Sequence, residues 1–242
     1  MLKKILIISA AILLGTYAVF AALFLRDDRS GTKCSDVTIS IDCDDTPSLT
    51  AEEIVRLLKG KKIYPLEKDL GNIDCTLIEK AVLDLSIVED CKCYKTHKNT
   101  LAIDITCKTP VMRVFSIGGD EYLIDDKGNI IEGTHNAVYL PVASGYIKRE
   151  MAQNEILQMA QFLGEEEFWN EQIEQVYFTQ KNEIVLVPRV GDHIIELGSI
   201  SNLEEKLNKL KDFYDEGLNR IGWNKYSKLN IEFDNKVIGT KK

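Results

Sequence analysis

The run ILIISAAILLGTYAVFAALFL, residues 5–25, sets the architecture of this chain. It carries no charge, and Lys3 and Lys4 precede it. As a helix rising about 1.5 Å per residue it would reach roughly 30 Å, the thickness of the hydrocarbon core of a bilayer. No second run of this kind follows in the sequence. We therefore expect a single-pass membrane helix, with the remaining chain on one side of the membrane.

A cleaved signal peptide is the alternative interpretation of the same run. Such peptides have an apolar region of roughly 7–15 residues before a small-residue cleavage site, and Val19-Phe20-Ala21 would provide that site. The run is longer than this, which favours an uncleaved anchor. The basic tail favours a cytoplasmic N-terminus, although Arg26 and Arg29 lie close behind the run.

Composition is that of an ordinary globular protein. Hydrophobic residues make up 45% of the chain and charged residues 28%, which argues against a disordered chain. The formal net charge of −8 argues against binding to nucleic acid or docking onto anionic lipid.

Cysteines occur only in the first half of the chain. Outside the cell they would be able to form disulfides, but the sequence does not choose among the pairings. Free buried thiols are the alternative. Zinc is disfavoured because the closest pair has a spacing one residue too short for a zinc knuckle. The six are Cys34, Cys43, Cys75, Cys91, Cys93 and Cys107.

The region from residue 37 to 107 predicts strand, helix, helix, strand, strand. Alternating apolar residues indicate strands at 37–43, 88–94 and 101–107. Capping-box spacings begin the two helices, Thr50 with Glu53 and Thr76 with Glu79, and Gly60 ends the first. A three-stranded sheet with both helices on one face would bury all these apolar stripes. Pro110 is expected to end this unit.

The second half predicts a mixed β domain with flanking helices, which makes the fold class α+β. One helix is expected to end at Gly164 and another at Gly217, and Gly128 supplies the positive φ of a hairpin turn. Strands are expected at 113–117, 121–124, 130–131, 138–142, 173–178, 184–187, 193–197 and 226–233, followed by a short terminal strand with Val237 and Ile238.

Several short motifs, taken in order, resemble the FtsQ (DivIB) family of cell-division proteins, in particular its Bacteroidetes-type members. They are Lys108-x-Pro110-Val-x-Arg113, Tyr122-Leu-Ile-Asp125-Asp-Lys-Gly128-Asn129, Lys206-Leu-x-Lys-Leu210, and Gly222-Trp223 with Tyr226. The resemblance implies a protein of the cell inner membrane and division septum, with its bulk in the periplasm. It implies a tail at 1–4, a transmembrane helix at 5–25, a stalk at 26–36, a POTRA domain at 37–111 and a C-terminal β domain at 112–242.

The chain departs from the family pattern in places. Ser86 stands where a proline usually opens the second POTRA strand, and Cys91 and Cys93 stand where alanine and valine are expected. Cys107 takes the place of a polar residue, and the short tail puts any cytoplasmic contact in doubt.

No constellation of reactive groups suggests an enzyme. His97, His135 and His193 all fall in or beside predicted turns, where lone histidines are usually solvated, and nucleophile-elbow, P-loop and metalloprotease motifs are missing from the sequence. We therefore expect no catalytic residue, cofactor, metal or small-molecule substrate.

Binding by strand addition is the expected function. A terminal strand tends to leave an edge of unpaired backbone groups, which accepts an extended segment of a partner. The resemblance implies that FtsB, itself paired with FtsL, binds at the last strands, so that the protein assembles the division machinery and links its early and late components. The alternative is an exported, membrane-anchored POTRA scaffold of a secretion or envelope-assembly system. The predicted partner-binding residues are Tyr226, Ser227, Lys228, Leu229, Asn230, Ile231, Phe233, Lys236, Val237 and Ile238.

Overall fold

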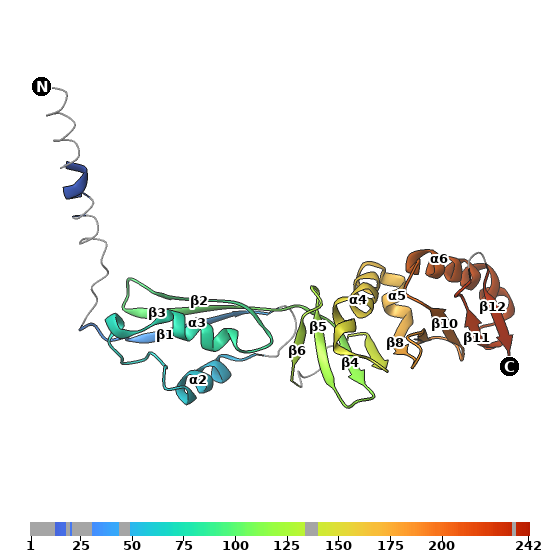
Figure 1. The fold of residues 1–242 in the computed structure, drawn as a ribbon, viewed down its shortest axis with the longest axis horizontal. Coiled ribbons are helices and arrows are strands. Elements are labelled where there is room, and N and C mark those ends of the chain that lie inside the picture. The colour runs from blue at the N-terminus through green and yellow to red at the C-terminus, as the bar shows by residue number, and fades with distance from the viewer. Residues whose placement is uncertain (1–12, 18–19, 21–30, 44–48, 134–139, 234–235) are drawn as a thin grey trace, which may run out of the picture. The chain divides into compact units, whose positions relative to one another are not determined.

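The computed structural model describes residues 13–17, 20, 31–43, 49–133, 140–233 and 236–242 (Figure 1). Contacts between residues divide the described chain into two compact units. The first extends to Ser40 and includes Ala51–Val82 and Cys91–Ile105. The second comprises Ile41–Thr50, Leu83–Asp90 and Thr106–Lys242.

The predicted membrane span lies largely outside the described residues. Of this stretch, residues 13–17 and 20 are described, and they are helical. Across the ranges that the structure describes, no helix combines the length and the apolar character needed to cross a bilayer.

The first part of the chain builds a three-stranded sheet with two α-helices, as the sequence predicts. The strand order is β1-β3-β2. Apolar residues of both helices and of the central strand are fully buried, among them Ile54, Val82 and Leu101. The elements are β1 (Asp36–Asp42), α2 (Ala51–Gly60), the 3₁₀ helix η1 (Leu70–Asn72), α3 (Cys75–Leu83), β2 (Val88–Lys95) and β3 (Thr100–Cys107).

Helix α3 begins with a different cap from the predicted one. The Asp74 carboxylate accepts hydrogen bonds from the backbone N–H groups of Thr76 at 2.9 Å and Leu77 at 3.4 Å, which makes Asp74 the N-cap. The Glu79 carboxylate, expected to complete a capping box with Thr76, instead accepts the N–H of Cys93 on β2 at 2.8 Å. The capping-box prediction was wrong because a stronger cap lies two residues earlier, and Glu79 is used to tie α3 to the sheet.

A disulfide joins Cys43, just after β1, to Cys107 at the end of β3. At the other end of these strands, the Ser35 N–H donates to the Asn99 carbonyl at 2.9 Å. The two strands therefore run in the same direction, and the bridge joins neighbouring strand ends. Cys34, Cys75, Cys91 and Cys93 are not joined by a disulfide in the described structure.

The second part of the chain builds a nine-stranded mixed sheet in the order β12-β11-β10-β9-β8-β7-β4-β5-β6, with helices packed on it (Figure 1). This agrees with the predicted mixed β domain. The pairs β4–β7, β7–β8 and β10–β11 are parallel. The elements are β4 (Pro110–Ser116), β5 (Glu121–Asp125), β6 (Ile130–Glu132), β7 (Val142–Gly145), η2 (Arg149–Gln153), α4 (Glu155–Glu165), α5 (Glu167–Gln172), β8 (Ile173–Phe178), β9 (Ile184–Pro188), β10 (Ile194–Gly198), α6 (Leu203–Phe213), the π-helical η3 (Tyr214–Leu218), α7 (Asn219–Ile221), β11 (Tyr226–Asn230) and β12 (Ile238–Lys241).

Several predicted ends of elements differ from the observed ones. Gly164 and Gly217 lie inside α4 and η3, and the second helical segment ends at Gly222, whose φ of 95° is a glycine conformation. Pro110 does not simply close the first unit. It is the first residue of β4, a strand position where a missing N–H is tolerated.

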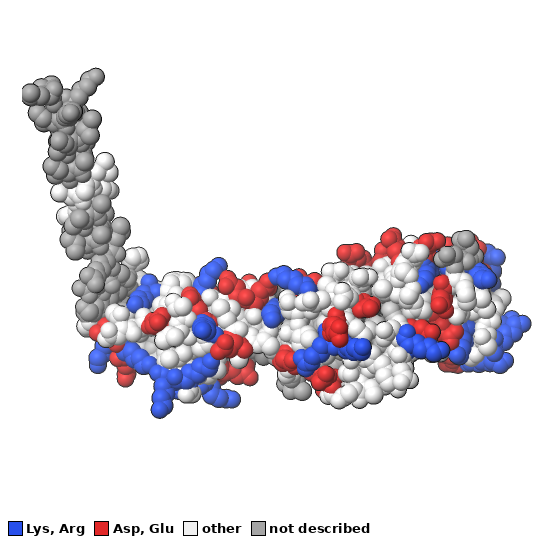
Figure 2. Space-filling view, in the orientation of Figure 1, with Lys and Arg blue, Asp and Glu red and all other residues white. Residues whose placement is uncertain are grey.

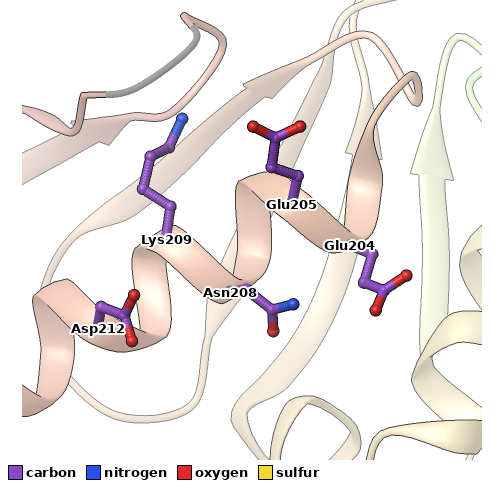
Figure 3. A pocket seen from close by; sticks show the side chains of 5 residues that line it. All are labelled: Glu204, Glu205, Asn208, Lys209 and Asp212. Atoms are coloured by element: carbon purple, nitrogen blue, oxygen red, sulfur yellow. The ribbon is translucent and has the colours of Figure 1, made fainter.

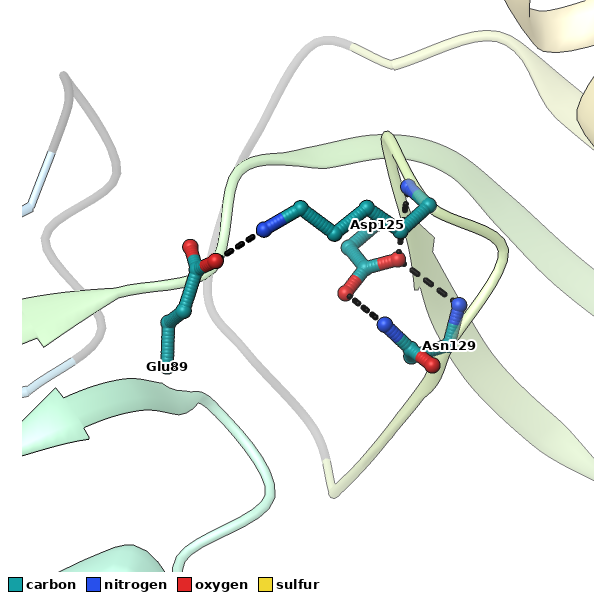
Figure 4. Close-up of polar contacts among 4 residues, drawn as sticks. Glu89, Asp125 and Asn129 are labelled. Carbon is teal, nitrogen blue, oxygen red and sulfur yellow. Dashed lines mark hydrogen bonds and ion pairs between the residues drawn. The ribbon is translucent and has the colours of Figure 1, made fainter.

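The turn between β5 and β6 is organised by the buried carboxylate of Asp125 (Figure 4). It accepts the backbone N–H groups of Lys127 at 2.9 Å and Asn129 at 2.7 Å, and the Asn129 side-chain amide at 2.9 Å. Gly128 has a φ of 79°, as expected for this turn. Beside the turn, the Lys127 ammonium pairs with Glu89.

Asp125→Ala is expected to lower the free energy of unfolding by about 2 kcal/mol, because it leaves three donors without their charged acceptor. Urea unfolding measures the change. Asp126→Ala is the matched control, since Asp126 is exposed in the same turn and should change stability by less than about 0.5 kcal/mol. Equal losses in both variants would contradict this role for Asp125.

Candidate functional site: an open strand edge

Strand β12 forms one edge of the nine-stranded sheet. It pairs antiparallel with β11, and among the described strands none lies beyond it. All four of its residues are exposed. Strand β11, by contrast, lies between β10 and β12 and has neighbours on both sides. The open edge is therefore β12 and not β11.

The opposite edge, β6, is capped by a side chain. The Ser86 hydroxyl donates to the Glu132 carbonyl at 2.9 Å and accepts the Glu132 N–H at 3.0 Å. A single serine thus occupies both backbone groups of the last residue of β6, as natural sheets often protect their edges. At the β6 edge, the backbone groups of Glu132 are already hydrogen-bonded to a side chain, whereas β12 has no described strand on its outer side.

The backbone groups that β12 offers can be assigned from its pairing with β11. The Lys242 N–H donates to the Lys225 carbonyl at 3.2 Å, so it points toward β11. Directions alternate along a strand. The extra residue of the bulge in this ladder lies on β11, between Tyr226 and Lys228, so the alternation continues along β12. The N–H and C=O groups of Lys241 and Gly239 therefore point away from β11, toward the position of an added strand.

Part of the predicted binding set belongs to the core. Leu229 and Ile231 are fully buried, so their side chains do not reach the surface. Tyr226 is half-buried and packs edge-on against Phe213, with ring centroids 6.0 Å apart. A Cβ added to Gly239 would lie 2.5 Å from the Tyr226 ring, which shows that the ring covers the glycine of β12. Leu229 and Ile231 therefore anchor this part of the sheet in the core, and Tyr226 packs against β12.

Another part of the predicted set makes polar contacts within the sheet. The Lys228 ammonium donates to one Glu196 carboxylate oxygen at 2.8 Å, and the Asn230 amide to the other at 3.3 Å. The Ser227 hydroxyl donates to the Thr240 carbonyl at 3.3 Å. The Glu196 pKa is lowered, chiefly by the hydrogen bond from Lys228. These contacts fix β11 between its neighbours.

The remaining predicted residues lie at the surface beside β12. Phe233 is 48% exposed and Ile238 43% exposed. The Lys236 ammonium lies 5.4 Å from the centroid of the Phe233 ring, while Val237 packs against the core. Phe233, Lys236 and Ile238 are thus the predicted side chains that a neighbouring strand would meet. The sequence missed Gly239 and Lys241, because the pattern did not show that β12 extends to residue 241.

Helix α6 lies close to this edge and carries a shallow polar hollow. Glu204, Glu205, Asn208, Lys209 and Asp212 line it, and Figure 3 shows their side chains spreading to both sides of the helix without converging. The Lys209 ammonium donates to the Phe233 carbonyl at 2.7 Å. The five side chains therefore do not form a common binding site. The hydrogen bond from Lys209 holds Phe233, which lies in the segment between β11 and β12.

Lysines gather at the C-terminal end of the β domain, although the chain as a whole is acidic (Figure 2). The Lys242 ammonium pairs with Asp192 at 2.7 Å. Lys225, Lys228, Lys236, Lys241 and Lys242 lie on β11 or β12 or within two residues of these strands.

His193 is not the solvated turn residue that the sequence predicts. It is 2% exposed, and its Nε2 lies 2.9 Å from the Tyr214 hydroxyl. Its ring packs against Gly191, which has a φ of 93° and leaves no room for a Cβ. Burial lowers the pKa of His193, opposed by the charge of Asp192. No group of three histidine, cysteine or acidic side chains in the described ranges is placed to hold a metal ion.

The buried imidazole makes stability depend on pH. Because the His193 pKa is lowered in the folded state, the unfolded state binds the extra proton first as pH falls below about 6.5. Stability is complete above that pH and is lost as pH falls toward the folded pKa, by up to about 1 kcal/mol between pH 7.5 and 5.5. Urea unfolding at both values checks this. His193→Gln should remove that part of the loss and His97→Gln, at an exposed position, should not; equal losses in all three proteins would contradict it.

Comparison with known protein families agrees with this architecture. Residues 32–106 match the POTRA-like domain, and residues 109–240 match a domain described as FtsQ/DivIB, C-terminal related. Both matches are to families of the scaffold type. The chain belongs to the FtsQ/DivIB family, whose domains indicate a role in cell division. No curated protein matches the chain.

Proposed function

We propose that this protein is a single-pass divisome assembly protein that binds an FtsB-type partner, itself paired with an FtsL-type protein, by strand addition at β12. The open edge of β12 is the observation that carries the proposal. Backbone groups of Gly239 and Lys241 point away from β11, and these are the groups that an added strand would bind. The match of residues 109–240 to the FtsQ/DivIB C-terminal domain favours this function over a secretion scaffold.

The side chains around β12 would determine which partner segments bind there. Phe233 and Ile238 offer exposed apolar surface, and the Lys236 ammonium lies against the Phe233 ring. Lys228, one of the predicted partner-binding residues, is already paired with Glu196, so it would have to exchange that partner. Anchored by residues 5–25 in the inner membrane, with its N-terminus in the cytoplasm, the protein would hold this edge in the periplasm at the septum. There it would link early and late division proteins.

Photo-crosslinking in living cells tests the proposal. A photoreactive amino acid at Ile238 or Lys236 of the full chain should give adducts with FtsB- or FtsL-type proteins, identified by mass spectrometry. Ile117 is the matched control, because it is 59% exposed and lies in the turn between β4 and β5. Adducts from Ile117 but none from the two positions near β12 would overturn the proposed site.

A further inference from the structure

The thiols of Cys75 and Cys93 lie side by side between α3 and β2. The Glu79 carboxylate accepts the Cys93 N–H at 2.8 Å, which places Glu79 against that point of the strand. Cys75 stands four residues before Glu79, one helical turn earlier on the same face of α3. Cys93 is buried, and its side chain points to the side of β2 that faces α3.

The Cys75 thiol is a hydrogen-bond partner of the Cys93 thiol. Burial raises the pKa of Cys93, and this contact raises it further. Cys75 is only partly buried, so it is the member of the pair that a reagent reaches.

We propose that Cys75 and Cys93 form a second disulfide, which fastens α3 to β2. The bridge between Cys43 and Cys107 supports this proposal, because it indicates an oxidising environment in which disulfides persist. The proposal does not depend on partner binding at β12.

The oxidant would be a protein or small molecule that carries a reactive disulfide. The Cys75 thiolate attacks one sulfur of that disulfide, which forms a mixed disulfide and releases the oxidant's first thiolate. The Cys93 thiol then loses its proton and attacks the Cys75 sulfur, which forms the new bond and releases the second thiolate. The two cysteines lose two protons and two electrons, and the oxidant is reduced to two thiols.

Cys91 is the competing partner, because it lies on the same face of β2 two residues away and is also buried. A tryptic digest separates the candidates, since Lys92 lies between them. Cys75 falls in peptide 69–80, Cys91 in 81–92, Cys93 in 93–95 and Cys107 in 99–108.

The experiment is peptide mapping of the full chain, isolated from the cell envelope with immediate alkylation and digested without reductant. We expect peptide 69–80 joined to 93–95, lighter by two hydrogen atoms than the two free peptides, and alkylated Cys91. Reduction before digestion should release both peptides. Recovery of Cys75 and Cys93 as alkylated peptides, in a sample where Cys107 is cross-linked, would overturn the proposal, and so would a link from 69–80 to 81–92.

Single variants give a second readout. In Cys93→Ala, Cys75 should become fully alkylated, and the thermal midpoint should keep only the part of its response to reductant that comes from the Cys43–Cys107 bridge. Cys34→Ala is the matched control, because Cys34 is a buried thiol that contacts the Asp36 carbonyl; its 69–80 peptide should stay cross-linked. Full alkylation of Cys75 in both variants and in the parent protein would show that no bridge forms.

Discussion

Lys241→Pro is expected to weaken binding of an FtsB-type partner strand at least about 100-fold, equal to about 2.7 kcal/mol. The Lys242 N–H points toward β11, so the N–H of Lys241 points toward the added strand. Proline removes this donor and places its ring where the neighbouring backbone would lie. Titration of the full chain in detergent with a labelled partner ectodomain measures the change.

The control for this variant keeps the backbone donor and removes only the side chain. Lys241→Ala should bind within about threefold of the parent protein, because its N–H still faces outward. Urea unfolding of both variants checks that the β domain remains folded. If alanine and proline weaken binding equally, the partner reads the lysine side chain and backbone pairing at β12 is not the mode of binding.

Replacing Cys43 and Cys107 together by alanine is expected to lower the free energy of unfolding by about 4 kcal/mol. The bridge joins residues 64 positions apart, and closing a loop of that length restricts the unfolded chain by about this amount. Because the two residues lie at neighbouring ends of β1 and β3, the bridge also holds together strands that are far apart in the sequence. Guanidinium unfolding measures the loss.

This experiment needs a background in which other cross-links play no part. In a Cys75→Ala, Cys93→Ala protein, reductant should reproduce the loss seen on removing Cys43 and Cys107. The variant that lacks all four cysteines should not respond to reductant. A loss below about 1 kcal/mol would show that the bridge contributes little to stability.

Much of the fold follows from short-range patterns in the sequence. The alternation at Leu101, Ile103 and Ile105 gave a strand whose three side chains are all buried. The helix predicted between the Thr50 cap and Gly60 is α2, which buries Ile54 and Leu58 on one side. Such patterns succeed because burial on one face imposes the period of the element itself.

Contacts between distant residues were beyond these patterns. His193 was predicted to be a solvated turn residue. In the structure it is buried against Tyr214, twenty-one positions later in the sequence. Similarly, the alternation at Leu229 and Ile231 indicated a strand but did not show which strands pair with it. The predicted partner-binding edge therefore included residues of β11, which lies between β10 and β12. Which strand ends a sheet depends on the pairing of the whole domain, which local periodicity does not contain.

The hydroxyl of Ser86 has a consequence for how copies of this protein associate. A sheet with two receptive ends would allow one molecule to add to the next, and such head-to-tail contacts grow into open-ended fibres. Here Ser86 already occupies the N–H and C=O of Glu132 on β6. Joining β12 of one copy to β6 of another would therefore have to displace the Ser86 hydroxyl, which disfavours growth in that direction.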